Sequence, residues 1–131
     1  MNPKKIWANF GVSDLARTIK FYNALGFRPN GEHYTKKELT SFLLGDDDFV
    51  IHFFLKDILE AGMKGKIADP SVANEIVFTL SAETKEQVDE WAKEVVKAGG
   101  KNISEPEEFG EGYYGFVFAD PDGHKFNVFC M

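Results

Sequence analysis

The chain has 131 residues, of which 44% are hydrophobic, so it is long and apolar enough to close one core without metals or disulfides. Its net charge of −6 argues against a nucleic-acid partner, because such binding draws its affinity from clustered Lys and Arg side chains. A single cysteine, no export signal and no apolar stretch of the roughly 18 residues that a membrane span needs predict a cytoplasmic protein without a membrane partner.

The first half of the chain predicts one strand, one helix and three further strands. Apolar and polar residues alternate over residues 6–12, as they do in a half-buried strand. Ser13 and Asp14 supply side chains that cap a helix N-terminus, and apolar residues then recur at helical spacing until Gly26. Three strand-like stretches follow, and a GDDD turn precedes the last of them. They cover residues 27–34, 38–44 and 49–55.

The second half repeats this order after a mixed segment, residues 56–73, which we interpret as a short helix and loop that acts as a linker or a lid. A strand is predicted at 75–81, and an amphipathic helix begins near Thr84 and ends at Gly99 and Gly100. Three strands complete the repeat, the last of them after a DPDG turn. They cover residues 102–104, 113–118 and 124–130.

The order strand, helix, strand, strand, strand therefore occurs twice. It predicts an α+β fold of two βαβββ modules that form curved mixed sheets, with the helices on the outer side and a concave ligand trough on the other. We expect a single domain, 1–131, made of a first module at about 5–55, a linker or lid at about 56–73 and a second module at about 74–131.

The strand faces opposite the predicted helices combine polar side chains with aromatic ones. That composition is typical of a small-molecule pocket, because apolar walls supply affinity and a few polar groups orient the ligand. Tyr113 belongs to the glycine-rich stretch EFGEGYYG, which suits a loop that closes over the trough. The residues expected to contact the ligand are Trp7, Asn9, Phe54, Tyr113, Asn127 and Phe129.

His52 and Glu75 are the candidates for catalysis on this face. A carboxylate beside an imidazole raises its basicity and fixes its tautomer, so Glu75 would orient His52. The alternative is a pair that only satisfies its own hydrogen bonds. His124, expected to be exposed at the end of a turn, and His33 are not assigned to the site. The sequence contains no phosphate cradle, serine-hydrolase elbow or CxxC pair, so the corresponding reactions have no support.

Three segments of the sequence resemble one known family. They are GVSDLARTIKFYNALGF at 11–27, KAGGK at 97–101 and FADPDGHKFNVF at 118–129. With these separations the chain resembles the vicinal oxygen chelate superfamily, which contains glyoxalases, bleomycin-resistance proteins, fosfomycin-modifying enzymes and extradiol dioxygenases. The resemblance runs nearly end to end and implies the fold predicted above, but it does not fix the reaction, because the superfamily supports many chemistries.

The resemblance also implies where a metal would be bound. Metal-dependent members place four ligands on the first, fourth, fifth and eighth strands, and the matching positions here are Trp7, His52, Glu75 and Asn127. An indole cannot ligate a divalent metal, and a neutral amide is a weaker ligand than a carboxylate. His52 and Glu75 are too few for a closed site, so we expect no cofactor. The alternative is a divalent metal (Zn, Ni, Mn or Fe) held by these two residues and completed by water or substrate.

Three functions are compatible with the resemblance. The first is a protein that binds or sequesters a small apolar or aromatic compound with an incomplete metal site, as bleomycin-resistance proteins sequester a drug. The second is an enzyme similar to a glyoxalase (lactoylglutathione lyase type) or an extradiol dioxygenase, in which His52 and Glu75 assist proton transfer. The third is a non-catalytic subunit with a vestigial trough. Besides the small-molecule ligand we expect a second copy of the chain as partner, because a homodimer would bury open strand edges. Whether the modules pair within one chain or between chains stays open.

Overall fold

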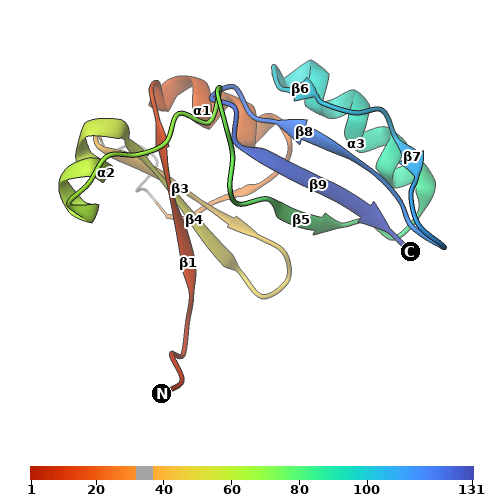
Figure 1. Ribbon diagram of the computed structural model, residues 1–131, viewed down its shortest axis with the longest axis horizontal. Helices are drawn as coiled ribbons and strands as arrows, with labels where there is room; N and C mark the ends of the chain where they lie inside the picture. The colour runs from red at the N-terminus through yellow and green to blue at the C-terminus, as the bar shows by residue number, and fades with distance from the viewer. Residues whose placement is uncertain (32–36) are drawn as a thin grey trace. The chain divides into compact units, whose positions relative to one another are not determined.

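The computed structural model describes residues 1–31 and 37–131, and the chain forms two compact units, Met1–Ile67 and Ala68–Met131 (Figure 1). The boundary between the units falls inside the predicted linker, 56–73, and leaves the helical part of that linker with the first unit. Part of the predicted strand 27–34 and the residue His33 lie outside the described residues. Among the residues described, no helix is long and apolar enough to span a membrane.

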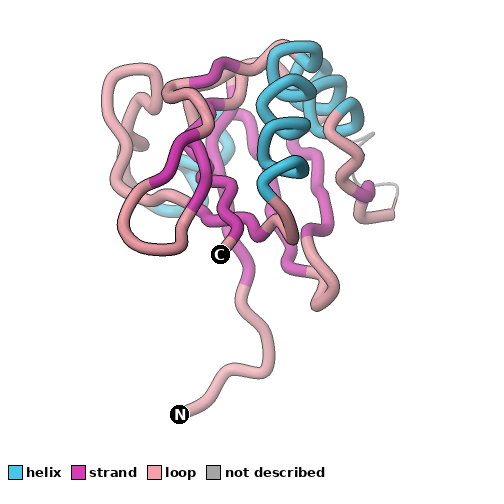
Figure 2. The backbone as a smooth tube through the Cα atoms, turned by 90° about the vertical axis from the view of Figure 1, so that its right-hand side faces the viewer, coloured by secondary structure: helices cyan, strands magenta, loops and turns pink. Residues whose placement is uncertain are grey.

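The first unit contains a four-stranded mixed sheet with the strand order β1-β4-β3-β2. β1 pairs with β4 in parallel, whereas the other neighbours are antiparallel. The residues before β1 run away from the sheet as a loop (Figure 2). The elements are β1 (Trp7–Val12), α1 (Leu15–Ala24), β2 (Arg28–Pro29), β3 (Leu39–Leu44), β4 (Phe49–Leu55) and α2 (Lys56–Met63).

Local chemistry sets the ends of α1, and its apolar side chains build the core of the first unit. The Asp14 side chain accepts a hydrogen bond from the backbone N–H of Arg17 at 3.1 Å, which satisfies one of the free donors of the first turn. Gly26, at φ +85°, follows the helix in the left-handed conformation that glycine tolerates best. Tyr22 is fully buried and lies against Phe53 of β4, with 4.6 Å between the ring centroids. α1 therefore covers the sheet face that carries Phe53.

The second unit contains a mixed sheet with the order β5-β9-β8-β6, and β7 pairs with β8 outside this path. β5 is parallel to β9, and the other pairs are antiparallel. β9 therefore lies between β5 and β8 (Figure 1). The elements are β5 (Phe78–Ser81), α3 (Lys85–Ala98), β6 (Lys101–Asn102), β7 (Glu107–Glu108), β8 (Tyr114–Ala119) and β9 (Lys125–Cys130).

α3 is capped as its sequence predicts and buries one apolar stripe. The Thr84 hydroxyl accepts from the N–H of Gln87 at 3.1 Å, and Gly99 ends the helix at φ +99°. The buried residues of α3 and the buried aromatic rings of β8 and β9 form the core of this unit. They are Val88, Ala92, Val95, Phe116, Phe118 and Phe126.

These two units confirm the predicted α+β fold, in which helices cover one face of each of two mixed sheets. Four details differ from the prediction. Within the described residues, the strand predicted at 27–34 forms only as the two-residue β2. β5 begins at Phe78, so the predicted strand 75–81 is three residues too long and Glu75 precedes it. The strand predicted at 102–104 forms as the two-residue β6. A two-residue strand, β7, was not predicted, because Glu107 and Glu108 carry no apolar alternation and become a strand only by pairing with β8.

Candidate functional site

We call the sheet face opposite α1 the open face of the first unit. Four polar residues lie in a row on this face. Because Ile51 and Phe53 are buried on the α1 side, alternation places His52 on the open face. Asn9 of β1 and Ser41 of β3 are both the register partners of His52. Asn30 donates from Nδ2 to Ser41 Oγ at 3.1 Å, and its backbone N–H donates to the Ser41 carbonyl at 3.0 Å. Asn9, His52, Ser41 and Asn30 thus form what we call the polar row.

The members of the polar row differ in how far solvent reaches them. Asn9 is exposed and His52 is half-buried, whereas Ser41 is fully buried. Asn9 and His52 are therefore the members that solvent reaches and that can donate or accept there, and none of the four side chains is a permanent ion.

Aromatic and aliphatic side chains surround the polar row. The Trp7 indole is 52% exposed and stands edge-on to the His52 ring, with the centroids 6.5 Å apart. Phe54 lies on the other side of His52 at 6.0 Å, also edge-on, and Leu39 is its register partner on β3. An exposed indole beside polar groups combines the apolar wall and the orienting contacts that ligand pockets use.

The helix α2 and the residues after it cover one end of the open face. A Cβ atom at Gly11 would lie 2.5 Å from Cδ1 of Ile67 and 3.5 Å from Cδ2 of Leu59, so glycine is needed for this close approach. Glu60 Oε2 accepts from the Ile67 N–H at 3.1 Å and fixes the segment after the helix. This part of the predicted lid therefore packs on the first unit. It lies at the end of the polar row that is nearer to Gly11.

In the second unit, Asn127 and Thr79 lie on the face opposite α3. They are register partners on β9 and β5, and Asn127 Nδ2 donates to Thr79 Oγ1 at 3.4 Å. Alternation supports this placement, because Phe126 and Val128 on either side of Asn127 are fully buried. Asn127 is half-buried and keeps its carbonyl oxygen as an acceptor.

Three aromatic rings gather at the end of the β7–β8 hairpin, and we call them the aromatic cluster. Phe109 lies 4.5 Å from Phe129 between ring centroids, and Tyr113 lies 6.2 Å from both. Phe109 is 38% exposed and Tyr113 is 40% exposed. The sequence pattern pointed to Tyr113 and Phe129 but not to Phe109, although the place of Phe109 in EFGEGYYG, two glycines away from Tyr113, was a signal for it.

Tyr114, next to the aromatic cluster, points to the helix side of the sheet. Its hydroxyl donates to Asp89 Oδ1 of α3 at 2.6 Å, and this hydrogen bond is the main reason that the pKa of Tyr114 is raised to about 12. Lys85 Nζ of α3 donates to Glu108 Oε1 of the neighbouring strand β7 at 2.6 Å, which raises the pKa of Lys85 and lowers that of Glu108. Both contacts fasten the hairpin to α3.

Two of the residues weighed from sequence have surroundings other than those expected. Glu75 is exposed and lies in the loop before β5 rather than on a strand, because pairing with β9 begins only at Phe78. His124 was expected to be exposed, and this is wrong: it is 8% exposed, with Nδ1 2.8 Å from Asp120 Oδ2. Asp120 Oδ1 also accepts three backbone N–H groups of the turn, including that of His124, so the pair organises the turn.

The donor atoms around His52 do not fit a closed four-ligand metal site. Its register partners Asn9 and Ser41 offer a neutral amide and a hydroxyl, and Trp7 offers an indole, which does not ligate divalent metals. Within residues 1–31 and 37–131, no three His, Cys, Asp or Glu side chains are grouped as metal ligands.

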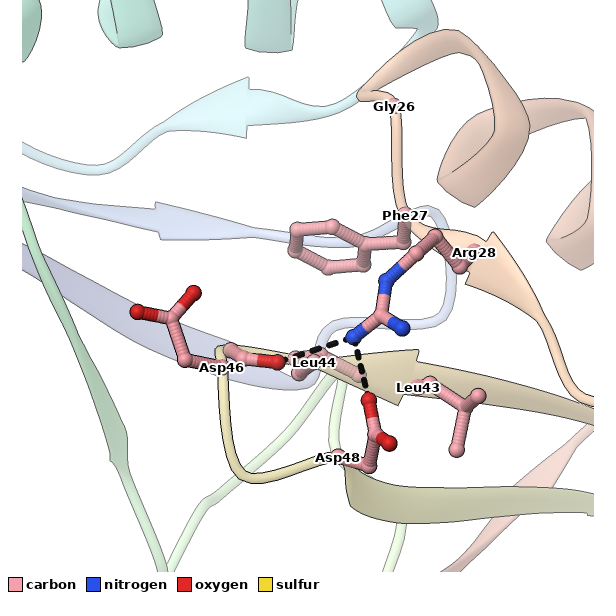
Figure 3. Close-up of a pocket in the computed structure, with 8 residues that line it drawn as sticks. Gly26, Phe27, Arg28, Leu43, Leu44, Asp46 and Asp48 are labelled. Carbon is pink, nitrogen blue, oxygen red and sulfur yellow. Dashed lines mark hydrogen bonds and ion pairs between the residues drawn. The ribbon is translucent and has the colours of Figure 1, made fainter.

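A hollow of about 490 Å³ lies elsewhere in the first unit, between the end of α1 and the β3–β4 turn. Arg28 reaches across it and donates to the Gly45 carbonyl at 2.8 Å, while the same nitrogen lies 2.6 Å from Asp48 Oδ1 (Figure 3). Asp46 points away from this pair (Figure 3). The guanidinium is thus engaged in holding the turn, and the open polar row is the better candidate for ligand binding.

Comparison with known proteins identifies the family. The Glyoxalase/Bleomycin resistance protein/Dioxygenase superfamily model matches residues 6–128. The hypothetical protein SA1046 from S. aureus has a similar structure, with a TM-score of 0.83 and 27% identity over 100% of this chain and 96% of its own.

Two further solved structures share the fold. A glyoxalase-related enzyme from Fulvimarina pelagi is 19% identical over 97% of this chain and 88% of its own, with a TM-score of 0.83. The fosfomycin resistance protein FosX from Mesorhizobium loti is 17% identical over 100% and 94%, with a TM-score of 0.68. No curated protein matches the sequence. The chain belongs to the Glyoxalase/Bleomycin resistance protein/Dioxygenase superfamily.

Proposed function

We propose that the protein is a cytoplasmic member of its superfamily that binds a small apolar or aromatic compound and holds it without chemical change. The observation that carries this proposal is the register that brings Asn9 and Ser41 to either side of His52, next to the exposed indole of Trp7. Apolar walls with a few convergent polar groups are the usual composition of a binding site for a small molecule.

The charges of the site favour an uncharged ligand. The polar row contains no Asp, Glu, Lys or Arg side chain. The net charge of −6 further disfavours an anionic compound. Within the second unit, Asn127, Tyr113 and Phe129 are proposed to contact a small apolar or aromatic compound, because they combine an amide acceptor with exposed aromatic surface.

The proposal can be tested with N-phenyl-1-naphthylamine, a neutral aromatic probe whose fluorescence increases in apolar sites. The chain has two tryptophans, and Trp91 stacks on Phe118 of the core at 6.2 Å, so in a Trp91→Phe variant all indole emission comes from Trp7. We expect saturable quenching of Trp7 by the probe. Trp7→Leu should weaken binding about tenfold, because a desolvated aromatic contact contributes on the order of 1 kcal/mol beyond its buried area.

The matched control for this experiment is Trp91→Phe itself, which should bind the probe as the wild type does. Linear quenching without saturation, or equal affinity of the Trp7→Leu variant, would contradict the proposal. If Trp7→Leu leaves a saturable probe signal unchanged but His52→Gln abolishes it, the ligand binds at the polar row and does not contact the indole.

We also propose that the protein forms a homodimer. In the described part of the first unit, β1 is an edge strand with one hydrogen-bonded neighbour, and Ile6 beside it is 77% exposed. Unpaired edges and exposed apolar side chains favour association between copies. Light scattering after size-exclusion chromatography should give twice the chain mass of 14.8 kDa at micromolar concentration, and a monomer would count against the dimer.

A further inference from the structure

We propose that the aromatic cluster of the second unit, Phe109, Tyr113 and Phe129, is by itself a subsite of that unit for a planar aromatic ring and selects aromatic over saturated ligands. The inference rests on the proposed function, because it names the class of compound that the binding protein would take. It adds Phe109 as a residue that determines specificity.

The backbone of the hairpin brings two rings together. Glu108 pairs with Tyr114 at the end of the β7–β8 ladder, and the N–H of Phe109 donates to the Tyr113 carbonyl at 3.1 Å. Gly110 and Gly112 have φ angles of +61° and +80°, which side chains with a Cβ rarely adopt. This tight loop sets the Phe109 and Tyr113 rings nearly parallel, at 19° and 6.2 Å between centroids.

The third ring, Phe129, supports the other two from β9. It lies 4.5 Å from Phe109 at an angle of 59°, so the cluster has two similar ring planes and one inclined plane. Gly115 is the register partner of Phe129, and the absence of a side chain there lets the Phe129 ring lie over the strand. The arrangement is therefore specified by backbone features and not only by the rings.

The hairpin is fastened on its helix side, which holds the cluster in place before any ligand binds. Tyr114 bonds to Asp89, Lys85 bonds to Glu108, and the Lys85 ammonium lies 5.4 Å from the centre of the Tyr114 ring. A site held in its binding geometry loses less conformational entropy on binding. Phe109 and Tyr113 nevertheless keep 38% and 40% of their surface exposed, although they are within reach of the apolar Phe129.

An aromatic ligand fits this exposed surface better than a saturated one of equal size. Rings interact with other rings through offset-stacked and edge-to-face contacts, and the two orientations in the cluster offer both. The Tyr113 hydroxyl can donate to or accept from a polar group on the ligand. Acidic residues flank the hairpin at Glu107, Glu108 and Glu111, so a neutral ring is favoured over an anionic one.

The test uses two neutral alcohols with the same carbon skeleton, 2-naphthol and decahydro-2-naphthol, titrated separately into the full chain by calorimetry. The wild type should bind 2-naphthol about tenfold more tightly than its saturated analogue. Phe109→Leu keeps a side chain of similar size and should reduce this preference to about twofold, by weakening the binding of 2-naphthol. Tyr113→Leu should act in the same direction.

Trp91→Phe is the matched control, because it alters an aromatic residue on the helix side that packs on Phe118 and should leave the preference unchanged. Circular dichroism and thermal unfolding of each variant establish that it folds. A preference that persists in Phe109→Leu and Tyr113→Leu overturns the subsite but leaves the proposed function standing. If the wild type binds neither alcohol, both proposals fail. If Phe109→Leu instead converts a dimer to a monomer in light scattering, a second copy covers the cluster, and the subsite is again overturned.

Discussion

Gly115 on β8 faces Phe129 on β9, and a Cβ atom at position 115 would lie 2.9 Å from Cδ1 of the Phe129 ring. The same atom would also overlap the Val128 carbonyl oxygen, which belongs to the backbone and cannot move aside cheaply. Gly115→Ala should therefore lower the free energy of unfolding by about 1–3 kcal/mol, the usual cost of overpacking a core. The urea midpoint measures this change.

Gly62→Ala is the matched control for that substitution. Gly62 lies in α2, and a Cβ atom there would meet no heavy atom within 4 Å. Alanine restricts the unfolded chain more than glycine does and has a higher helix propensity. Gly62→Ala should therefore leave the free energy of unfolding unchanged or raise it by about 0.4–1 kcal/mol. If both variants shift the midpoint alike, the close packing of Phe129 on Gly115 is contradicted.

The hydrogen bond from Tyr114 to Asp89 predicts a pH dependence. The neutral phenol donates this bond, which raises the pKa of Tyr114 to about 12 in the folded protein, above its ordinary value of about 10. The bond therefore stabilises the fold fully below about pH 10, and its contribution is lost as the pH rises from about 10 through about 12. Absorbance titration at the phenolate band should show a step at about pH 12 that belongs to Tyr114. Asp89→Asn should move that step toward lower pH, and an unchanged titration would refute the assignment.

Asp120 should matter for stability because it holds the turn before β9 together. It is 4% exposed, and its Oδ1 accepts three backbone N–H groups while Oδ2 faces His124. Asp120→Ala should cost about 1–3 kcal/mol or more, since buried donors would lose their acceptor. Asp46→Ala, in an exposed turn, should change the free energy of unfolding by less than about 0.5 kcal/mol. If Asp120→Ala and Asp46→Ala change the free energy of unfolding equally in chemical denaturation, the structural role of Asp120 is contradicted.

The donor set around His52 predicts the response to metals. Because a neutral amide, a hydroxyl and an indole surround the imidazole, chelation with EDTA should leave the melting temperature unchanged. Titration of nickel, zinc or manganese should give no stoichiometric heat. Tight one-to-one binding that is lost in His52→Gln and in Glu75→Gln would instead favour an enzyme that uses these two residues, and would overturn our interpretation of Trp7.

The sequence predicted the elements whose ends depend on local chemistry. Asp14 and Gly26 bound α1, and Thr84 and Gly99 bound α3, because capping and positive φ angles are properties of a few neighbouring residues. Alternation also placed Phe53 on the helix side of its strand, where Tyr22 packs on it. These features do not depend on how distant strands are aligned.

Other features depend on pairing between distant residues and were missed. The alternation that includes Glu75 resembles a strand, but the ladder with β9 starts at Phe78. Ser41 and Asn30 enter the polar row only through the register of β3 against β4 and through a contact across 11 residues, which no single strand pattern reveals. The burial of His124 follows from its pairing with Asp120, a contact specific to this turn.

Nuclear magnetic resonance of the full chain titrated with N-phenyl-1-naphthylamine tests the central claim most directly. Trp7 and Trp91 each give one indole N–H signal, and the His52 ring can be assigned with a His52→Gln variant. We predict saturable shifts of the Trp7 and His52 signals at a common dissociation constant, with the Trp91 signal unmoved in the core beside Phe118. Saturable binding that leaves Trp7 and His52 unshifted would contradict the polar row as the ligand site.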